Sequence, residues 1–208
     1  KGDKVEVLNN AGVFTFNLMG DWSGKTFSGS AQSESININS DGLTLAGISG
    51  KDTVSGSIST TKFIIGDEYT KTISGNDVVL TFGENSLTLK EAANLDTLTI
   101  DGATVGIYFD VEGGKFLIKT AEDLQTLASY STNHTTAGKT FKLTNNIALP
   151  ENFTIGNFSG TLDAVHIGAH LELGAELVAH GLKQRLIADV HEMIRDLERG
   201  IDEAVLVQ

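Results

Sequence analysis

The first candidates for chemistry are histidines near the C-terminal end of the sequence. His166 and His170 are four residues apart, and Glu172 follows them. Two histidines at this spacing on a helix can bind a metal ion. However, Gly168 lies between them, and His191–Glu192 has no second histidine that would complete an HExxH motif. We therefore expect these histidines to lie in solvent or in packing contacts, and we predict no metal site.

Acidic residues are the second candidates. Asp67–Glu68 and Glu122–Asp123 are neighbouring acids, and paired carboxylates perform glycoside hydrolysis. Adjacent residues on a strand point to opposite faces, so we expect solvated charges instead. Ser74–Asp77 is similar to a calcium-binding turn of repeat exoproteins, but such sites need tandem copies, and an ordinary turn is expected. No catalytic or cofactor-binding residue and no cofactor is predicted.

Other motifs that would indicate an enzyme do not occur in the sequence. There is no Gly-x-Ser-x-Gly elbow, phosphate loop or dinucleotide fingerprint. There is also no cysteine, which excludes disulfides, thiolate metal ligands and thiol nucleophiles. The single tryptophan, Trp22, is expected in the core rather than on a sugar-stacking platform.

Composition limits the partners of the chain. The net charge is −12, so the chain repels phosphate backbones and gains nothing from an anionic membrane. We expect no nucleic-acid partner and no membrane insertion. Of the 208 residues, 40% are hydrophobic, which is enough to form a core. Lys1 is not a start residue and no signal peptide is visible, so the chain is expected to be a processed or excised piece.

The sequence changes character at about Asp163. Ser, Thr and Asn are frequent before this residue and absent after it, and all three arginines follow it. We predict three segments: a Ser/Thr/Asn/Gly-rich β region at 1–110, a second β region with one short helix at 111–163, and a helical tail at 164–208. The tail is a natural domain, an engineered fusion or the product of a shifted reading frame.

Short apolar runs between Gly, Asn, Asp and Ser turns dominate residues 1–110. Ser35–Asn39 alternates with period two, which places both isoleucines on one face. Asp41–Gly42 and Asp101–Gly102 are hairpin turn signals. Leu-Thr-Leu begins at Leu43 and again at Leu87, and a Leu-Thr-Ile variant begins at Leu98; these unequal intervals do not make one period. The fold is predicted to be mainly β, with a β-solenoid or β-sandwich-like body and a C-terminal amphipathic α-helix.

Residues 115–163 combine strands with a short helix. Phe116–Ile118 is predicted to be a strand, and Thr120 caps a helix with Asp123 in a capping-box arrangement. This helix is expected to bury Leu124, Leu127 and Ala128 on one face. Lys139–Leu143 alternates as a further strand.

This segment resembles bacterial surface proteins with GLUG-type β-helical repeats. The resemblance is carried by Ile118–Ala128, Gly138–Leu149 and Ile155–Asp163, about a quarter of the chain. It implies a right-handed parallel β-helix and a role in cell-surface adhesion or display. The repeats of that family continue with a Gly-His pair after the aspartate, whereas this chain continues with Ala164–His166.

The tail carries a long helical pattern from Ala175 to about Val205. Such a helix is not stable alone in water, so we expect a partner: the β body or another copy of the chain. Apolar residues at spacings of three and four would form the contact: Leu182, Leu186, Val190, Met193, Leu197 and Ile201.

These observations predict a non-enzymatic structural or adhesive module that is secreted or displayed on a bacterial surface. Its expected partner is a protein or glycan at a surface. Two alternatives remain open: a glycan-binding or carbohydrate-active β module, and a chimera whose tail is an oligomerisation or docking helix.

Overall fold

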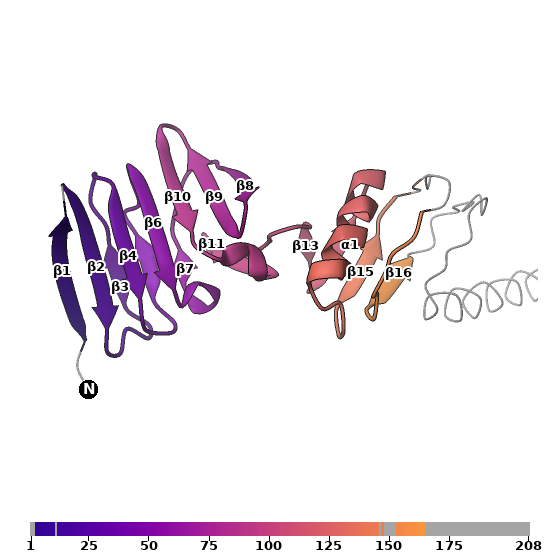
Figure 1. Cartoon of the computed structure of the whole chain (residues 1–208), viewed down its shortest axis with the longest axis horizontal. Coiled ribbons are helices and arrows are strands. Elements are labelled where there is room, and N and C mark those ends of the chain that lie inside the picture. The colour runs from indigo at the N-terminus through magenta and orange to yellow at the C-terminus, as the bar shows by residue number, and fades with distance from the viewer. Residues whose placement is uncertain (1–2, 11, 146, 148–152, 165–208) are drawn as a thin grey trace, which may run out of the picture. The chain divides into compact units, whose positions relative to one another are not determined.

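The computed structural model describes residues 3–10, 12–145, 147 and 153–164 (Figure 1). Within these ranges the chain is mainly β, as predicted. It divides into two compact units, with the boundary between Val111 and Glu112. The predicted tail helix, its self-association residues, and the histidine candidates at 166–192 lie outside the described residues. No helix in the described part is long and apolar enough to cross a membrane.

The first unit contains a seven-stranded sheet (Figure 1). Its central strands β2, β4, β6 and β10 are parallel to one another, whereas β1, β9 and β8 each pair antiparallel with a neighbour. In spatial order the strands are β1 (Lys4–Asn10), β2 (Val13–Met19), β4 (Glu34–Ile38), β6 (Lys51–Gly56), β10 (Asn85–Leu89), β9 (Asp77–Phe82) and β8 (Thr70–Ser74).

A five-stranded sheet completes the first unit. Here β3, β5, β7 and β11 are parallel to one another, and β12 is antiparallel to β11. In spatial order the strands are β12 (Ala103–Gly106), β11 (Thr97–Ile100), β7 (Lys62–Phe63), β5 (Thr44–Ala46) and β3 (Thr26–Ser28). Two 3-10 turns, η1 (Ile58–Thr60) and η2 (Ala92–Asn94), lie between strands of different sheets.

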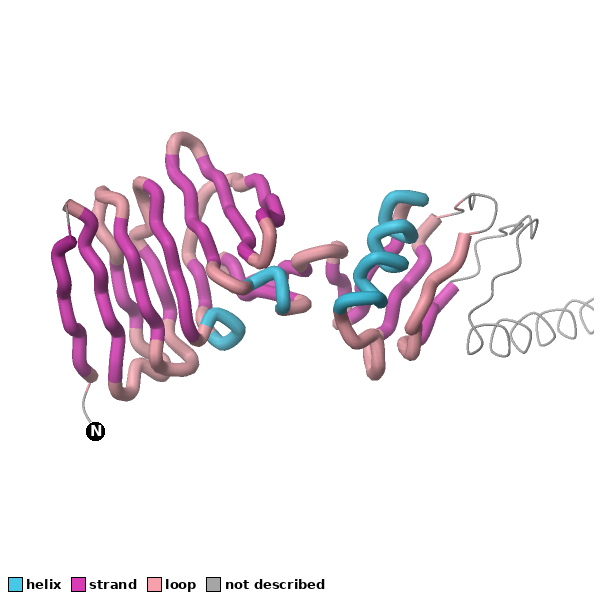
Figure 2. Tube along the Cα trace, in the orientation of Figure 1, coloured by secondary structure: helices cyan, strands magenta, loops and turns pink. Residues whose placement is uncertain are grey.

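Successive strands from β2 to β7 alternate between the two sheets, so the chain coils (Figure 2). The register gives an equal step along the chain for three of these strands. Thr26 of β3 lies opposite Thr44 of β5, and Thr44 lies opposite Lys62 of β7, whereas the step from β2 to β4 is two residues longer. Asp41–Gly42 is therefore not a hairpin turn, because the strands that flank it, β4 and β5, belong to different sheets. Asp101–Gly102 does join an antiparallel pair, β11 and β12, as predicted.

The core of the first unit lies between the two sheets. Side chains alternate along each strand, and the inward ones are buried, as Ile36 and Ile38 are on β4. The parallel register stacks equivalent positions of successive coils. Phe63 lies opposite Leu45 on one side and Ile100 on the other, and all three are almost fully buried.

The second unit pairs strands of one sheet in the order β13 (Val111–Glu112), β14 (Lys115–Ile118), β15 (Thr140–Leu143) and β16 (Thr161–Ala164). The α-helix α1 (Ala121–Asn133) connects the parallel strands β14 and β15. The predicted capping box is confirmed: Thr120 Oγ1 accepts from the backbone N–H of Asp123, and the Asp123 carboxylate accepts from that of Thr120. Leu124 and Leu127 are buried, whereas Ala128 is half-buried.

Candidate functional site

The outer face of the seven-stranded sheet carries rows of polar side chains in register. In one row, Asn17 Nδ2 donates to Glu6 Oε2 at 2.9 Å, and Asn37 Nδ2 donates to Asn17 Oδ1 at 2.7 Å. Ser55 Oγ then donates to Asn37 Oδ1 at 2.5 Å. These four residues come from β1, β2, β4 and β6, so the row crosses four neighbouring strands.

The row is continued by an ion pair at the other side of the sheet. Lys90 follows β10, and its Nζ lies 2.5 Å from Asp77 Oδ2 at the start of β9. The Lys90 hydrogen bond lowers the pKa of Asp77 below its ordinary value, and the backbone N–H of Glu91 contributes in the same direction. The ion pair thus connects β9 to the residue that follows β10 on the same face of the sheet.

A second row lies on the same face, two residues earlier along β2, β4 and β6. Hydroxyl side chains are opposite one another on β2, β4, β6 and β10, and each is partly exposed. The strand spacing in a sheet is about 4.8 Å, so this face presents hydroxyl groups at a regular repeat. We name this face, with both rows, the hydroxyl–amide face. Its members are Thr15, Ser35, Thr53 and Thr88 in the second row, and Glu6, Asn17, Asn37 and Ser55 in the first.

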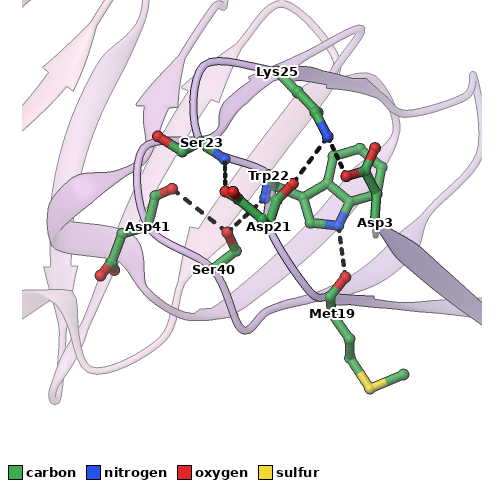
Figure 3. A network of polar contacts seen from close by, with 8 residues as sticks. All are labelled: Asp3, Met19, Asp21, Trp22, Ser23, Lys25, Ser40 and Asp41. Atoms are coloured by element: carbon green, nitrogen blue, oxygen red, sulfur yellow. Dashed lines mark hydrogen bonds and ion pairs between the residues drawn. The ribbon is translucent and has the colours of Figure 1, made fainter. Parts of the chain in front are cut away.

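Trp22 lies at the corner between β2 and β3 (Figure 3). Its indole Nε1 donates to the Met19 carbonyl at 3.1 Å, and its ring meets Phe27 edge-on, with 6.1 Å between ring centroids. Its backbone N–H donates to Ser40 Oγ of the next coil at 2.8 Å. The ring is partly buried and packs against the core cluster, so Trp22 lies at the edge of the core.

The same corner carries a lysine network. Lys25 Nζ donates to the Asp21 carbonyl at 3.0 Å and forms an ion pair with Asp3 (Figure 3). Both side chains of the pair are exposed, so the contact contributes little to stability. We interpret this corner as a structural joint between coils.

The two acidic pairs from the sequence belong to different units. Asp67 and Glu68 are exposed in the loop before β8. Asp123 accepts hydrogen bonds from the backbone N–H groups of Lys119 and Thr120, so it serves the start of α1. Asp67, Glu68 and Glu122 are exposed, as expected for solvated charges, but neither pair lies on a strand: one is in a loop and the other in α1.

The Ser74–Asp77 segment, which was compared with a calcium-binding turn, connects β8 and β9. Ser74 lies opposite Asp77 in an antiparallel pair. Asp77 is engaged by Lys90 and by the backbone N–H of Glu91, and Asn76 Nδ2 donates to Glu91 Oε2 at 3.1 Å. This segment is a hairpin turn with its polar groups used internally, as expected from a single copy of the motif.

Sequence reasoning missed two buried acids, Glu34 and Asp52, which are 2% and 1% exposed. They face the core at the start of β4 and in β6. Burial is the main cause that raises the pKa of Asp52 to about 6, and the nearby charge of Glu34 adds to it. The signal that could have found them is the period-two pattern: Glu34 continues the inward series of Ile36 and Ile38.

Comparison of the chain with protein-family models, with curated proteins and with solved structures finds no match. The resemblance of residues 115–163 to GLUG-type repeats therefore stays a prediction from the sequence. The function must be inferred from the geometry of the two units.

Proposed function

We propose that this chain is a non-enzymatic structural and adhesive module, secreted or displayed on a bacterial surface, whose first unit is a short β-solenoid. The observation that carries the proposal is the hydroxyl–amide face. Four parallel strands from successive coils present Ser, Thr and Asn side chains in register on one side of a sheet. Such a face offers many weak hydrogen-bonding sites to an extended partner and no enclosed site for a small substrate.

The coil architecture supports this proposal. Strands β2 to β7 alternate between two sheets, and β3, β5 and β7 follow one another at an equal step along the chain; both features support a solenoid over two independently wound sheets. Solenoids display long regular surfaces because each coil contacts only its neighbours. The acidic net charge of −12 favours solubility, which suits an exposed module.

The second unit contributes to the proposal through its sequence resemblance. Its parallel strands β14, β15 and β16 and the helix between the first two are compatible with the GLUG-type pattern. On that basis we assign the chain to cell-surface adhesion or display, with a protein or glycan as partner. The glycan-binding alternative shares the same face, because sugar hydroxyls pair well with Asn and Ser side chains.

The test is binding of the full chain to immobilised mucin and fibronectin, with and without enzymatic removal of their glycans. Thr53→Glu changes the centre of the hydroxyl–amide face, and Thr44→Glu makes the same change on the outer face of the five-stranded sheet. We expect saturable binding that Thr53→Glu abolishes and Thr44→Glu retains. Binding that disappears with the glycans would favour the glycan-binding alternative, and absence of saturable binding to both surfaces would contradict an adhesive role.

A further inference from the structure

Two carboxylates lie side by side inside the first unit. Glu34 and Asp52 immediately precede Ser35 and Thr53, which are opposite one another in the parallel pair of β4 and β6. Both acids belong to the inward series of their strands and are almost fully buried. They therefore occupy equivalent positions of successive coils.

The surroundings across the sheet are apolar. Phe14 of β2 lies opposite Glu34, and Leu87 of β10 lies opposite Asp52. Lys51, the neighbour of Asp52 in the chain, is exposed, because adjacent residues of a strand face opposite sides. Burying two negative charges in such a place costs free energy of folding unless a proton or a cation compensates them.

Two turns between the sheets lie beside the Glu34 carboxylate. The backbone N–H of Ser30 donates to Glu34 Oε1 at 3.0 Å and to Oε2 at 3.1 Å, and Ser30 Oγ also donates to Oε1. The turn of the next coil lies close by: a Cβ atom on Gly29 would stand 2.8 Å from Glu34 Oε2 and 3.1 Å from the Gly47 carbonyl oxygen. The absence of a side chain at Gly29 keeps this space between the turns.

The hydrogen bonding of Asp52 is incomplete. Its Oδ1 accepts from the backbone N–H of Glu34 at 2.9 Å, which places the Asp52 carboxyl beside Glu34. Its Oδ2 is buried and has no partner at hydrogen-bonding geometry, although the nearby backbone N–H of Ser49 also acts on the carboxyl and lowers its pKa. An unpaired buried carboxylate oxygen costs free energy, so this atom indicates a ligand that supplies the missing interaction.

We propose that Glu34 and Asp52, with Ser30 Oγ and the Gly47 carbonyl, bind a divalent hard cation, Ca²⁺, between two coils of the first unit. Calcium takes oxygen ligands from carboxylates and backbone carbonyls, and two carboxylates balance its charge. No three His, Cys, Asp or Glu side chains gather in the described part of the chain, so neutral oxygens must complete the shell. A site with so few carboxylates fits the weak affinities of extracellular modules, about 10⁻⁴–10⁻³ M.

A proton is the alternative to a cation at this place, and the two lead to different stabilities of the native chain and the variant. Asp52→Asn keeps the shape and the Oδ1 acceptor but removes the charge. In a chelator at pH 7.5 this variant gains stability, because it no longer buries a charged pair. In calcium the native chain gains stability from binding and the variant does not. Calcium therefore narrows the difference in stability between the variant and the native chain only if the site binds the cation.

The experiment is thermal unfolding of the full chain at pH 7.5 in EDTA, in millimolar CaCl2 and in NaCl of equal ionic strength, with calcium titration by calorimetry. The variants are Asp52→Asn and Glu34→Gln, and the control is Glu84→Gln in an exposed turn. We expect a calcium-induced rise of the midpoint in the native chain and the control, and its loss in Asp52→Asn. If Glu34→Gln does not fold, Asp52→Asn decides alone.

Two outcomes would overturn the proposal. If the difference in stability between Asp52→Asn and the native chain is the same in EDTA and in calcium, the pair holds a proton only. If both site variants keep the calcium response, the cation binds elsewhere. The cation site does not depend on the adhesive role, since it lies between coils and not on the outer face.

Discussion

The two units of this chain use parallel strands in different ways. In the first unit, strands of successive coils stack with their buried side chains in line, and only short turns connect the sheets. In the second unit, the 13-residue helix α1 connects β14 to β15. The first unit thus depends on register between coils, whereas the second depends also on a locally encoded helix.

This difference determines where each unit is sensitive to substitution. A stacked core repeats the same contact in every coil, so one truncation leaves a cavity between two neighbours. A capped helix depends on a few hydrogen bonds at its start. Truncations of the core should therefore have the largest effects, and the loss of the cap a smaller one.

Phe63→Ala and Phe141→Ala form a matched pair, because each phenylalanine is fully buried in its own unit. Each change should lower the free energy of unfolding by about 3–5 kcal/mol. Urea unfolding can be followed both by far-UV circular dichroism and by the fluorescence of Trp22, the only tryptophan, which lies in the first unit. We expect Phe63→Ala to shift the fluorescence transition and Phe141→Ala to leave it in place.

A fluorescence shift of equal size in both variants would contradict the comparison. It would mean that the two units unfold as one cooperative body, so that contacts in the second unit stabilise the first.

The next effect concerns pH and belongs to the first unit alone. Asp52 has a pKa of about 6 in the folded chain against an ordinary value of 3.8, so the folded chain holds this proton more tightly than the unfolded chain. Stability is then lost as pH rises from about 4 to about 6, by up to about 3 kcal/mol in the absence of a cation. Urea unfolding in EDTA across this range should show the loss.

Asp52→Asn is the matched variant for this measurement. Its stability should exceed that of the native chain above pH 6, and the gap should close toward pH 4. A gap of constant size at every pH would mean that Asp52 titrates at its ordinary value and that burial does not raise its pKa.

The sequence allowed the prediction of a mainly β chain but not of its coils. The repeated Leu-Thr-Leu at Leu43 and Leu87 does not reveal the period, because the first copy belongs to β5 of the five-stranded sheet and the second to β10 of the seven-stranded sheet. In addition, the hairpin of β8 and β9 is inserted between β7 and β10 and interrupts the spacing. The equal step between β3, β5 and β7 appears only when the strands are aligned by register.

The buried acids were missed for a related reason. Charged side chains are usually exposed, so the charge of Glu34 outweighed the period-two pattern that places it with Ile36 and Ile38, and the contacts that bury it come from distant residues. The start of α1 was predictable because all of its determinants lie close to Thr120 in the chain. Local hydrogen bonding can be read from the sequence, whereas contacts between coils depend on distant residues.

The smallest predicted effect tests this local determinant. Thr120→Ala removes the acceptor for the Asp123 N–H and should lower the free energy of unfolding by about 1 kcal/mol. Thr132→Ala is the control in the last turn of the same helix, where the Thr hydroxyl bonds to the Ala128 carbonyl and alanine is the better helix former. Hydrogen exchange of the α1 amides should accelerate in Thr120→Ala alone, with Trp22 fluorescence unchanged. If exchange is the same in both variants, packing of Leu124 and Leu127 holds the helix without its cap, and the second unit depends on its core as the first one does.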